Sequence, residues 1–213
     1  MKLSFLKKKT MDNFESIVDV SRYLSLKNRE LKIDTLTPFE ADNINTLIRF
    51  WNIEDEELNK TFAEREPIKI YINSLGGSLD AALTIVDSIT MSRTPVYTFN
   101  IGTIQKESFL IYLAGHKRLT YENATFLFTT LILSSDKLVL DSEKEKTTYY
   151  SKEKLLEERE EKIKTFFLDR VKMSDVQYDK YNKKELWFSS SEAIKLHISN
   201  EILRRHFHFV KQK

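Results

Sequence analysis

The stretch IKIYINSLGGSLDAALTIVDSI, residues 68–89, contains an isoleucine-rich segment, a pair of glycines and an amphipathic segment in close succession. Residues 68–73 have the alternating, β-branched composition of a buried strand. After the glycines the apolar side chains recur at helical spacing, and they are Leu79, Leu83, Val86 and Ile89. A strand that turns sharply into a helix is typical of a βαβ unit. Residues 68–89 therefore predict an α/β fold.

The same alternation extends on both sides of this stretch. Pro38 opens one of the helices on the N-terminal side, as proline often does. The expected elements are a strand at 29–37, a helix at 38–57, a strand at 94–102, a helix at 103–115, one or two strands within 116–133, a polar helix at about 142–172, and a C-terminal run of short helix, strand-like turn, helix and closing strand. The pattern predicts parallel strands joined by helices.

Length and composition narrow the class of protein. The 213 residues suffice for one good core, with 41% hydrophobic and 31% charged residues, as in a soluble globular protein. A net charge of +2 argues against nucleic acid as a partner. The absence of cysteine excludes disulfides and thiolate metal sites and fits a reducing compartment. No window approaches the roughly 18 apolar residues of a membrane span. We therefore expect a cytoplasmic protein without a membrane partner.

All four glycines lie between Gly76 and Gly115, so the constrained backbone is expected in the centre of the chain. Within it, IGTIQKESFL (101–110) passes from an apolar run into a helical pattern. A strand-to-helix turn of this kind can expose a nucleophile above the edge of a sheet. Four residues after Gly102, where a serine would be expected, the chain has Lys106.

Residues 68–89 closely resemble the glycine-pair segment of ClpP, the serine peptidase subunit of the Clp system. The resemblance covers about residues 29–203 and continues through FNIGTIQKESFLIYLAGHKRL (99–119), YENATFLFTT (121–130) and LWFSSSEAIKLHISNEI (186–202). It implies the ClpP/crotonase-like α/β fold, a spiral of stacked βαβ units with a protruding helical handle. The expected organisation is an N-terminal arm at 1–28 and a single ClpP-like domain at 29–213, with the handle at about 131–172.

The resemblance also implies where catalytic residues would lie. The family's nucleophilic serine lies 29 residues after the second glycine of the pair, and in this chain that position is Lys106. The histidine base corresponds to Thr129 and the aspartate to Tyr181, with Asp179 close to that position. All three positions of the triad are replaced, so no catalytic residue is expected.

Part of the family's oxyanion hole is expected to remain, because Gly76 and Gly77 still offer backbone N–H groups. Glu107 places a carboxylate where the family has an uncharged side chain. Residues 131–146 contain no glycine, although the family has a glycine-rich strand there that pairs with substrate peptides. Lys106 is expected to fill the former active site and Ser108 to pack beside it.

Three other arrangements remain open. The first is a dyad of Lys106 and Ser108, although residues two apart on a helix do not face one another. The second pairs Asp179 with His197, which stands where the family has a structural glycine. The third is a metal site at His206 and His208, which share one strand face but have no evident third ligand. For His116, in a basic turn, the expectation is a solvated side chain, and no metal or cofactor is expected.

The resemblance therefore predicts a degenerate ClpP-type serine peptidase, a pseudopeptidase that acts through assembly. The implied partners are further copies of the chain in a heptameric ring, or an active ClpP subunit in a mixed ring, with an AAA+ unfoldase as an additional partner. The alternative is an active serine-type endopeptidase with relocated catalytic residues. A crotonase-like activity that uses only the paired glycines is a weaker option, since nothing in the sequence suggests a coenzyme A site.

Overall fold

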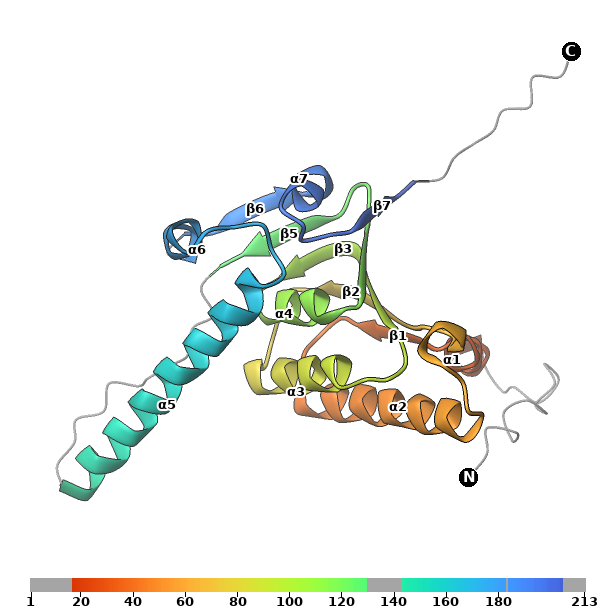
Figure 1. Cartoon of the computed structure of the whole chain (residues 1–213), viewed down its shortest axis with the longest axis horizontal. Helices are drawn as coiled ribbons and strands as arrows, with labels where there is room; N and C mark the ends of the chain where they lie inside the picture. The colour runs from red at the N-terminus through yellow and green to blue at the C-terminus, as the bar shows by residue number, and fades with distance from the viewer. Residues whose placement is uncertain (1–16, 130–142, 183, 205–213) are drawn as a thin grey trace, which may run out of the picture.

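The computed structural model of the chain describes residues 17–129, 143–182 and 184–204. Its helices and strands alternate along most of the chain (Figure 1). In order they are α1 (Ile17–Lys27), β1 (Glu30–Ile33), α2 (Pro38–Glu57), the 3₁₀ turn η3 (Phe62–Glu64), β2 (Ile68–Ser74), α3 (Leu79–Thr90), β3 (Val96–Gln105), α4 (Glu107–Ala114), β4 (Lys117–Tyr121), β5 (Thr125–Phe128), α5 (Glu143–Leu168), α6 (Asp175–Asn182), β6 (Leu186–Ser189), α7 (Ser190–Lys195) and β7 (Glu201–Leu203). The predicted α/β class is confirmed.

The strands form one predominantly parallel sheet. Its main path runs β1-β2-β3-β4-β7, and every neighbouring pair on this path is parallel. β5 also pairs in parallel with β3, and β6 pairs antiparallel with β5. Parallel neighbours need crossover connections, which α2, α3 and α4 supply.

β3 changes its partner halfway along its length. Up to Asn100 it pairs with β4, and from Thr103 onward it pairs with β5. Against β2 the register passes from Ile72↔Asn100 to Ser74↔Ile104, so β3 holds two extra residues there. A bulge of this kind redirects a strand and often lies beside a functional site. The bulge includes Gly102 and aims the end of β3 toward β5.

This extension corrects one sequence prediction. The helix expected at 103–115 begins only at Glu107, because Thr103–Gln105 continue β3 as partners of β5. Glycine and threonine suggested the end of a strand, whereas here they accommodate the bulge. The end of β3 therefore lies next to the end of β5, directly before the turn at Lys106.

Helices α2, α3 and α4 pack side by side against the sheet (Figure 1). The core they share with the strands is rich in isoleucine and aromatic side chains. Every residue of α4 from Ser108 to Ala114 is buried, so this helix runs through the interior of the molecule. Its buried position fixes the direction in which the preceding turn can point.

Helix α5 projects away from the rest of the molecule, with its N-terminal end farthest out (Figure 1). Its C-terminal part is held by Ile163 and Phe167, which are buried in the core. Phe167 contacts the rings of Phe109, Phe128 and Tyr178. α5 lies within the range predicted for the handle, and α1 lies within the range predicted for the N-terminal arm. Among the described residues, no helix is both long and apolar enough to cross a membrane.

Candidate functional site: a strand-to-helix elbow occupied by lysine

Lys106 is the single residue between the end of β3 and the start of α4. Its backbone has φ 51° and ψ −127°, a conformation that costs energy for any residue other than glycine. Its side chain is exposed. A strained turn between a strand and a helix is the geometry that presents a nucleophilic serine in hydrolases with a nucleophile elbow. The chain has the backbone geometry of such an elbow, and the residue at its tip, the position of the nucleophile, is Lys106.

Ser108, the other residue considered for nucleophilic chemistry, is fully buried. Its hydroxyl lies 2.6 Å from the carbonyl oxygen of Gln105 and 3.3 Å from that of Ser74, and it accepts the Gln105 N–H at 3.1 Å. These contacts hold the two arms of the elbow together, and no part of the hydroxyl faces solvent. The residue is placed to support the turn rather than to attack a carbonyl.

The paired glycines lie beside the elbow and have the positive φ values that glycine tolerates, 101° for Gly76 and 154° for Gly77. The Gly76 N–H donates to the hydroxyl oxygen of Ser74 at 3.2 Å. The Gly77 N–H donates to Oε2 of Glu107 at 2.9 Å. Both donors predicted to remain from an oxyanion hole therefore have acceptors within the chain.

Lys106 is exposed, and its Cβ lies beside the glycine turn, because a Cβ added to Gly76 would lie 2.9 Å from it. The neighbouring Glu107 is half-buried, and its carboxylate reaches the same turn. That Lys106 fills the former active site stays a prediction.

Thr129 and Tyr181, the positions that the resemblance assigns to the family's histidine and aspartate, come from elements that neighbour the elbow. Gln105 pairs with Leu127, so Lys106 and Thr129 both follow the ends of adjacent parallel strands. Tyr178 of α6 packs on Phe128, which places α6 at the same end of β5. Thr129 and Tyr181 are half-buried, and among the described residues no hydrogen bond joins either of them to Lys106. The structure brings the three elements together without a proton relay between them.

The remaining candidates are engaged elsewhere. Asp179 lies 2.9 Å from Nζ of Lys164, which also pairs with Asp175 at 2.9 Å. Lys164 donates hydrogen bonds to both carboxylates, and these bonds raise the pKa of Lys164. His197 has φ 58° just after α7, and its N–H donates to the Ile194 carbonyl. This is the left-handed position that usually follows a helix and favours glycine, which agrees with the family's glycine at this point.

His116 is exposed, as expected, and its ring is also held in place by contacts within the chain. Its Nδ1 accepts the N–H of Val96 at 3.0 Å, and its ring packs edge-on against Phe62. Partial burial lowers the pKa of this histidine. His206 and His208 lie outside the described residues. Across the described ranges, no cluster of three or more histidine, aspartate or glutamate side chains is arranged to hold a metal ion.

Two asparagines that the sequence reasoning passed over shape the site. Oδ1 of Asn73 accepts the Thr103 N–H at 3.0 Å and fills the space where a side chain on Gly102 would lie. Asn100 is buried, donates to the Thr125 carbonyl at 2.8 Å and accepts the Gly102 N–H at 3.1 Å. Together they hold the bulge that directs β3 to the elbow. An asparagine near the end of each of two neighbouring strands was the available signal.

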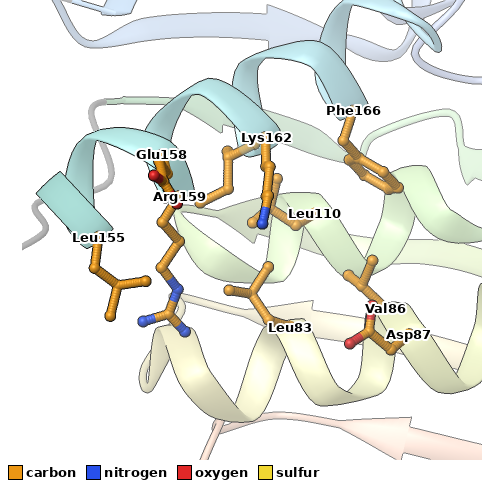
Figure 2. A pocket seen from close by; sticks show the side chains of 10 residues that line it. Leu83, Val86, Asp87, Leu110, Leu155, Glu158, Arg159, Lys162 and Phe166 are labelled. Carbon is orange, nitrogen blue, oxygen red and sulfur yellow. The ribbon is translucent and has the colours of Figure 1, made fainter.

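A groove of about 430 Å³ opens beside α4, between α3 and α5 (Figure 2). Leu110, one turn into α4, and Leu83 of α3 form part of its apolar wall. Arg159 of α5 forms an ion pair with Asp80 at the start of α3, which ties the projecting helix to the turn after the glycines. The groove is lined by Leu83, Val86, Asp87, Leu110, Leu155, Glu158, Arg159, Lys162, Ile163 and Phe166.

Comparisons with known proteins agree with this geometry. The family model described as Clp protease matches residues 57–206, most of the chain. The chain is 25% identical over 149 residues to the ATP-dependent Clp protease proteolytic subunit 2 of Treponema denticola, covering 69% of this chain and 71% of that protein. The protein of the same description from Treponema pallidum (strain Nichols) is 24% identical over 142 residues, covering 66% of this chain and 68% of that protein.

Among solved structures, a point mutant of ClpP1 from Listeria monocytogenes has a similar fold, with a TM-score of 0.64. The likeness covers 87% of this chain and 96% of that one at 21% identity. The fold is thus the ClpP/crotonase-like fold that the glycine-pair segment predicted. The chain belongs to the Clp protease family, as a homologue of its ClpP proteolytic subunits.

Proposed function

We propose that this chain is a non-catalytic ClpP-like subunit that acts through assembly, as a structural or regulatory part of a Clp-type ring. The observation that carries the proposal is the elbow itself. Its strained backbone is intact, yet the residue at its tip is Lys106 and the nearby hydroxyl of Ser108 is buried and bonded to backbone groups.

The chemistry supports this reading. A serine peptidase needs a hydroxyl at the elbow, a base to take its proton and donors for the oxyanion. Thr129 and Tyr181, at the base and orienter positions, have hydroxyl groups in place of the imidazole and carboxylate that a triad uses. Loss of a complete triad costs a comparable peptidase roughly six orders of magnitude in turnover. An amine at the elbow that attacked a peptide carbonyl would form another stable amide rather than an ester that water can hydrolyse.

The proposed partners follow from the family. The relatives named above are described as proteolytic subunits of an ATP-dependent protease. We infer that the chain joins a ring, either with copies of itself or with an active ClpP subunit, and that an AAA+ unfoldase is the ATP-dependent partner of that ring in the cytoplasm. The projecting, largely polar helix α5 fits contact with another subunit.

The competing function is an active serine-type endopeptidase with relocated catalytic residues. It is tested by incubating the purified chain with a fluorophosphonate probe and a small peptide substrate. The proposal predicts no covalent labelling and no cleavage. Labelling that the Ser108→Ala variant abolishes and the Thr129→Ala variant retains would overturn it, because it would identify Ser108 as a nucleophile.

Assembly is tested separately by co-purification with an active ClpP subunit. The tagged chain is expected to retain that subunit, and Lys106→Ala is expected to retain it equally, since the proposal assigns no role to chemistry at the elbow. Failure of the wild-type chain to retain the active subunit would restrict the proposal to rings made of this chain alone.

A further inference from the structure

We propose that the Glu107 carboxylate is the resident ligand of the former oxyanion site, and that it closes this site to a substrate carbonyl. The proposal concerns the state of the site in the folded chain. It stands whether or not the chain joins a mixed ring.

The first observation is a direct hydrogen bond. Gly77 donates its N–H to Oε2 of Glu107 at 2.9 Å. In a hydrolase, an N–H in this position donates to the oxygen that gains negative charge during attack on a carbonyl. An ionised carboxylate oxygen carries such charge before any reaction begins, and charge-assisted hydrogen bonds are stronger than neutral ones. Glu107 therefore supplies the acceptor that a substrate would supply only during the reaction.

The second observation is the fit of the glycine turn around this side chain. A Cβ atom placed on Gly76 would collide first with Oε2 of Glu107 and then with Cβ of Lys106. The turn therefore approaches the carboxylate closely, and glycine is favoured at position 76 by its φ of 101° and by the nearby Lys106 Cβ. The hydrogen bond from Gly77 and the close approach at Gly76 are separate observations, and both identify the Glu107 carboxylate as the group that lies against the glycine turn.

The third observation is where Glu107 lies in α4. It is the first residue of the helix, directly after the elbow, where free N–H groups and the helix dipole favour negative charge. The side chain is half-buried and spans from the β3–α4 turn to the β2–α3 turn. One carboxylate thus links the two turns that frame the site.

The site is consequently blocked in two independent ways. Lys106 removes the nucleophile, and Glu107 occupies a donor that would stabilise the oxyanion. Removal of one oxyanion donor costs a hydrolase roughly 10²–10³ in turnover. Restoring a serine at position 106 alone would therefore leave the second block in place, and a ligand that binds the glycine turn must first displace Glu107.

Nuclear magnetic resonance can test this contact without any activity. The chain has only four glycines, so labelling with ¹⁵N-glycine gives four backbone amide signals. Gly77 alone follows another glycine, so labelling of the glycine carbonyl carbon with ¹³C identifies its amide by a one-bond coupling. In Glu107→Ala, the Gly77 amide proton is expected to shift upfield and to exchange with solvent roughly tenfold faster, because a charged acceptor is lost.

The Gly102 and Gly115 signals serve as internal controls for folding. Glu57→Ala, at an exposed position at the end of α2, is the matched control and should leave all four signals in place. If Glu107→Ala does not fold, Glu107→Gln keeps an oxygen acceptor without the charge and should move the Gly77 signal less far in the same direction. An unchanged Gly77 signal in a folded variant would overturn the proposal. That result would leave the assembly function untouched, since the measurement does not depend on it.

Discussion

At the residue scale, Lys106 retains a backbone conformation that lysine adopts only at a cost. Such conformations cost about 1–3 kcal/mol each and persist where the surroundings determine them. Here the Ser108 hydroxyl joins both arms of the elbow, and the following helix is buried. The surrounding contacts therefore impose the strained conformation at Lys106, and they do so although this residue has no nucleophilic hydroxyl.

This strain predicts that Lys106→Gly stabilises the protein. Glycine adopts positive φ without strain but loses more entropy on folding, so we expect a net gain of about 1 kcal/mol in the free energy of unfolding. Lys106→Ala keeps the strain and should change stability little. Urea unfolding at one fixed protein concentration compares the two, because assembly alters apparent stability. A glycine variant less stable than the alanine variant would contradict the assignment of strain.

A second residue-scale feature is the buried carboxylate of Asp55. Arg29 donates to its two oxygens at 2.6 and 2.9 Å, and Thr94 donates at 3.0 Å. Burial alone would raise the pKa of Asp55, but the hydrogen bonds from Arg29 and Thr94 outweigh it and hold the pKa below its usual value. The cluster joins the end of α2 to β1 and to the start of β3.

Asp55→Asn should lower the free energy of unfolding by about 3 kcal/mol at neutral pH, because the buried Arg29 loses its charged partner at both Asp55 oxygens and keeps only the partly exposed Glu54 as an ion-pair partner. A carboxyl whose pKa is lower in the folded state stabilises it above its unfolded pKa of about 4, and this contribution is lost as pH falls through the folded pKa. The difference between wild type and variant should therefore shrink in acid.

Denaturant unfolding between pH 7 and pH 3 measures that change. Asp34→Asn is the control, because Asp34 also pairs with a cation, Lys32, but is exposed, and such pairs contribute little. A constant gap between wild type and Asp55→Asn across this pH range would show that ionisation of Asp55 is not the source of the stability.

At the scale of elements, the attachment of α5 depends on one aromatic cluster. Phe167 is 1% exposed and contacts Phe109, Phe128 and Tyr178 with ring centroids 4.7–5.8 Å apart. Phe128 ends β5, and Phe109 lies in the first turn of α4. The helix proposed to contact other subunits is thus anchored against the elements that form the elbow.

Phe167→Ala should lower the free energy of unfolding by about 3–5 kcal/mol, the usual cost of removing a buried phenylalanine. Amide hydrogen exchange should rise first in the C-terminal part of α5, because this ring attaches the helix to the core. Leu155→Ala, on the same helix but 62% exposed, should leave both measurements nearly unchanged. Equal protection of α5 in the two variants would contradict this anchoring role.

The spacing of apolar residues predicted several elements closely. Helix α2 begins at Pro38 and ends at Glu57 as expected. Its bounds were predictable because a proline at the start of a helix and a helical spacing of apolar residues are both local features of the sequence. The predicted length of β3 was wrong, because its last residues are strand through pairing with β5 and, at Ile104, with β2. The pairing with β5 joins segments about twenty residues apart and leaves no local pattern. The roles of Asn73 and Asn100 were missed because they too depend on contacts between strands, and their only signal was an asparagine near the end of each of two predicted strands.

The candidate site was predictable only in part. Counting residues from the paired glycines identified Lys106 as the position of the family's nucleophile, and the structure places Lys106 at a strained elbow. Side-chain directions were not predictable, because they depend on how the elbow and α4 are oriented. The sequence therefore indicated that Glu107 brings a carboxylate to the site, but not that this carboxylate accepts the Gly77 N–H while Lys106 is exposed.

At the scale of the whole molecule, the chain combines a complete ClpP-like core with a projecting helix and an elbow that lacks a nucleophile (Figure 1). Under the proposed function, this core provides surfaces for neighbouring subunits independently of the chemistry at Lys106. We therefore expect substitutions at the elbow to leave assembly intact and loss of the α5 anchor to weaken it. Sedimentation of Lys106→Ala and Phe167→Ala beside the wild type compares these two effects.

Function through assembly can be measured by native mass spectrometry of the purified 25.2 kDa chain at micromolar concentration. The chain is measured alone and after co-expression with an active ClpP subunit. We expect masses that are multiples of the chain mass, or mixed assemblies that contain both subunits. A stable monomer under both conditions would show that the chain does not act through assembly.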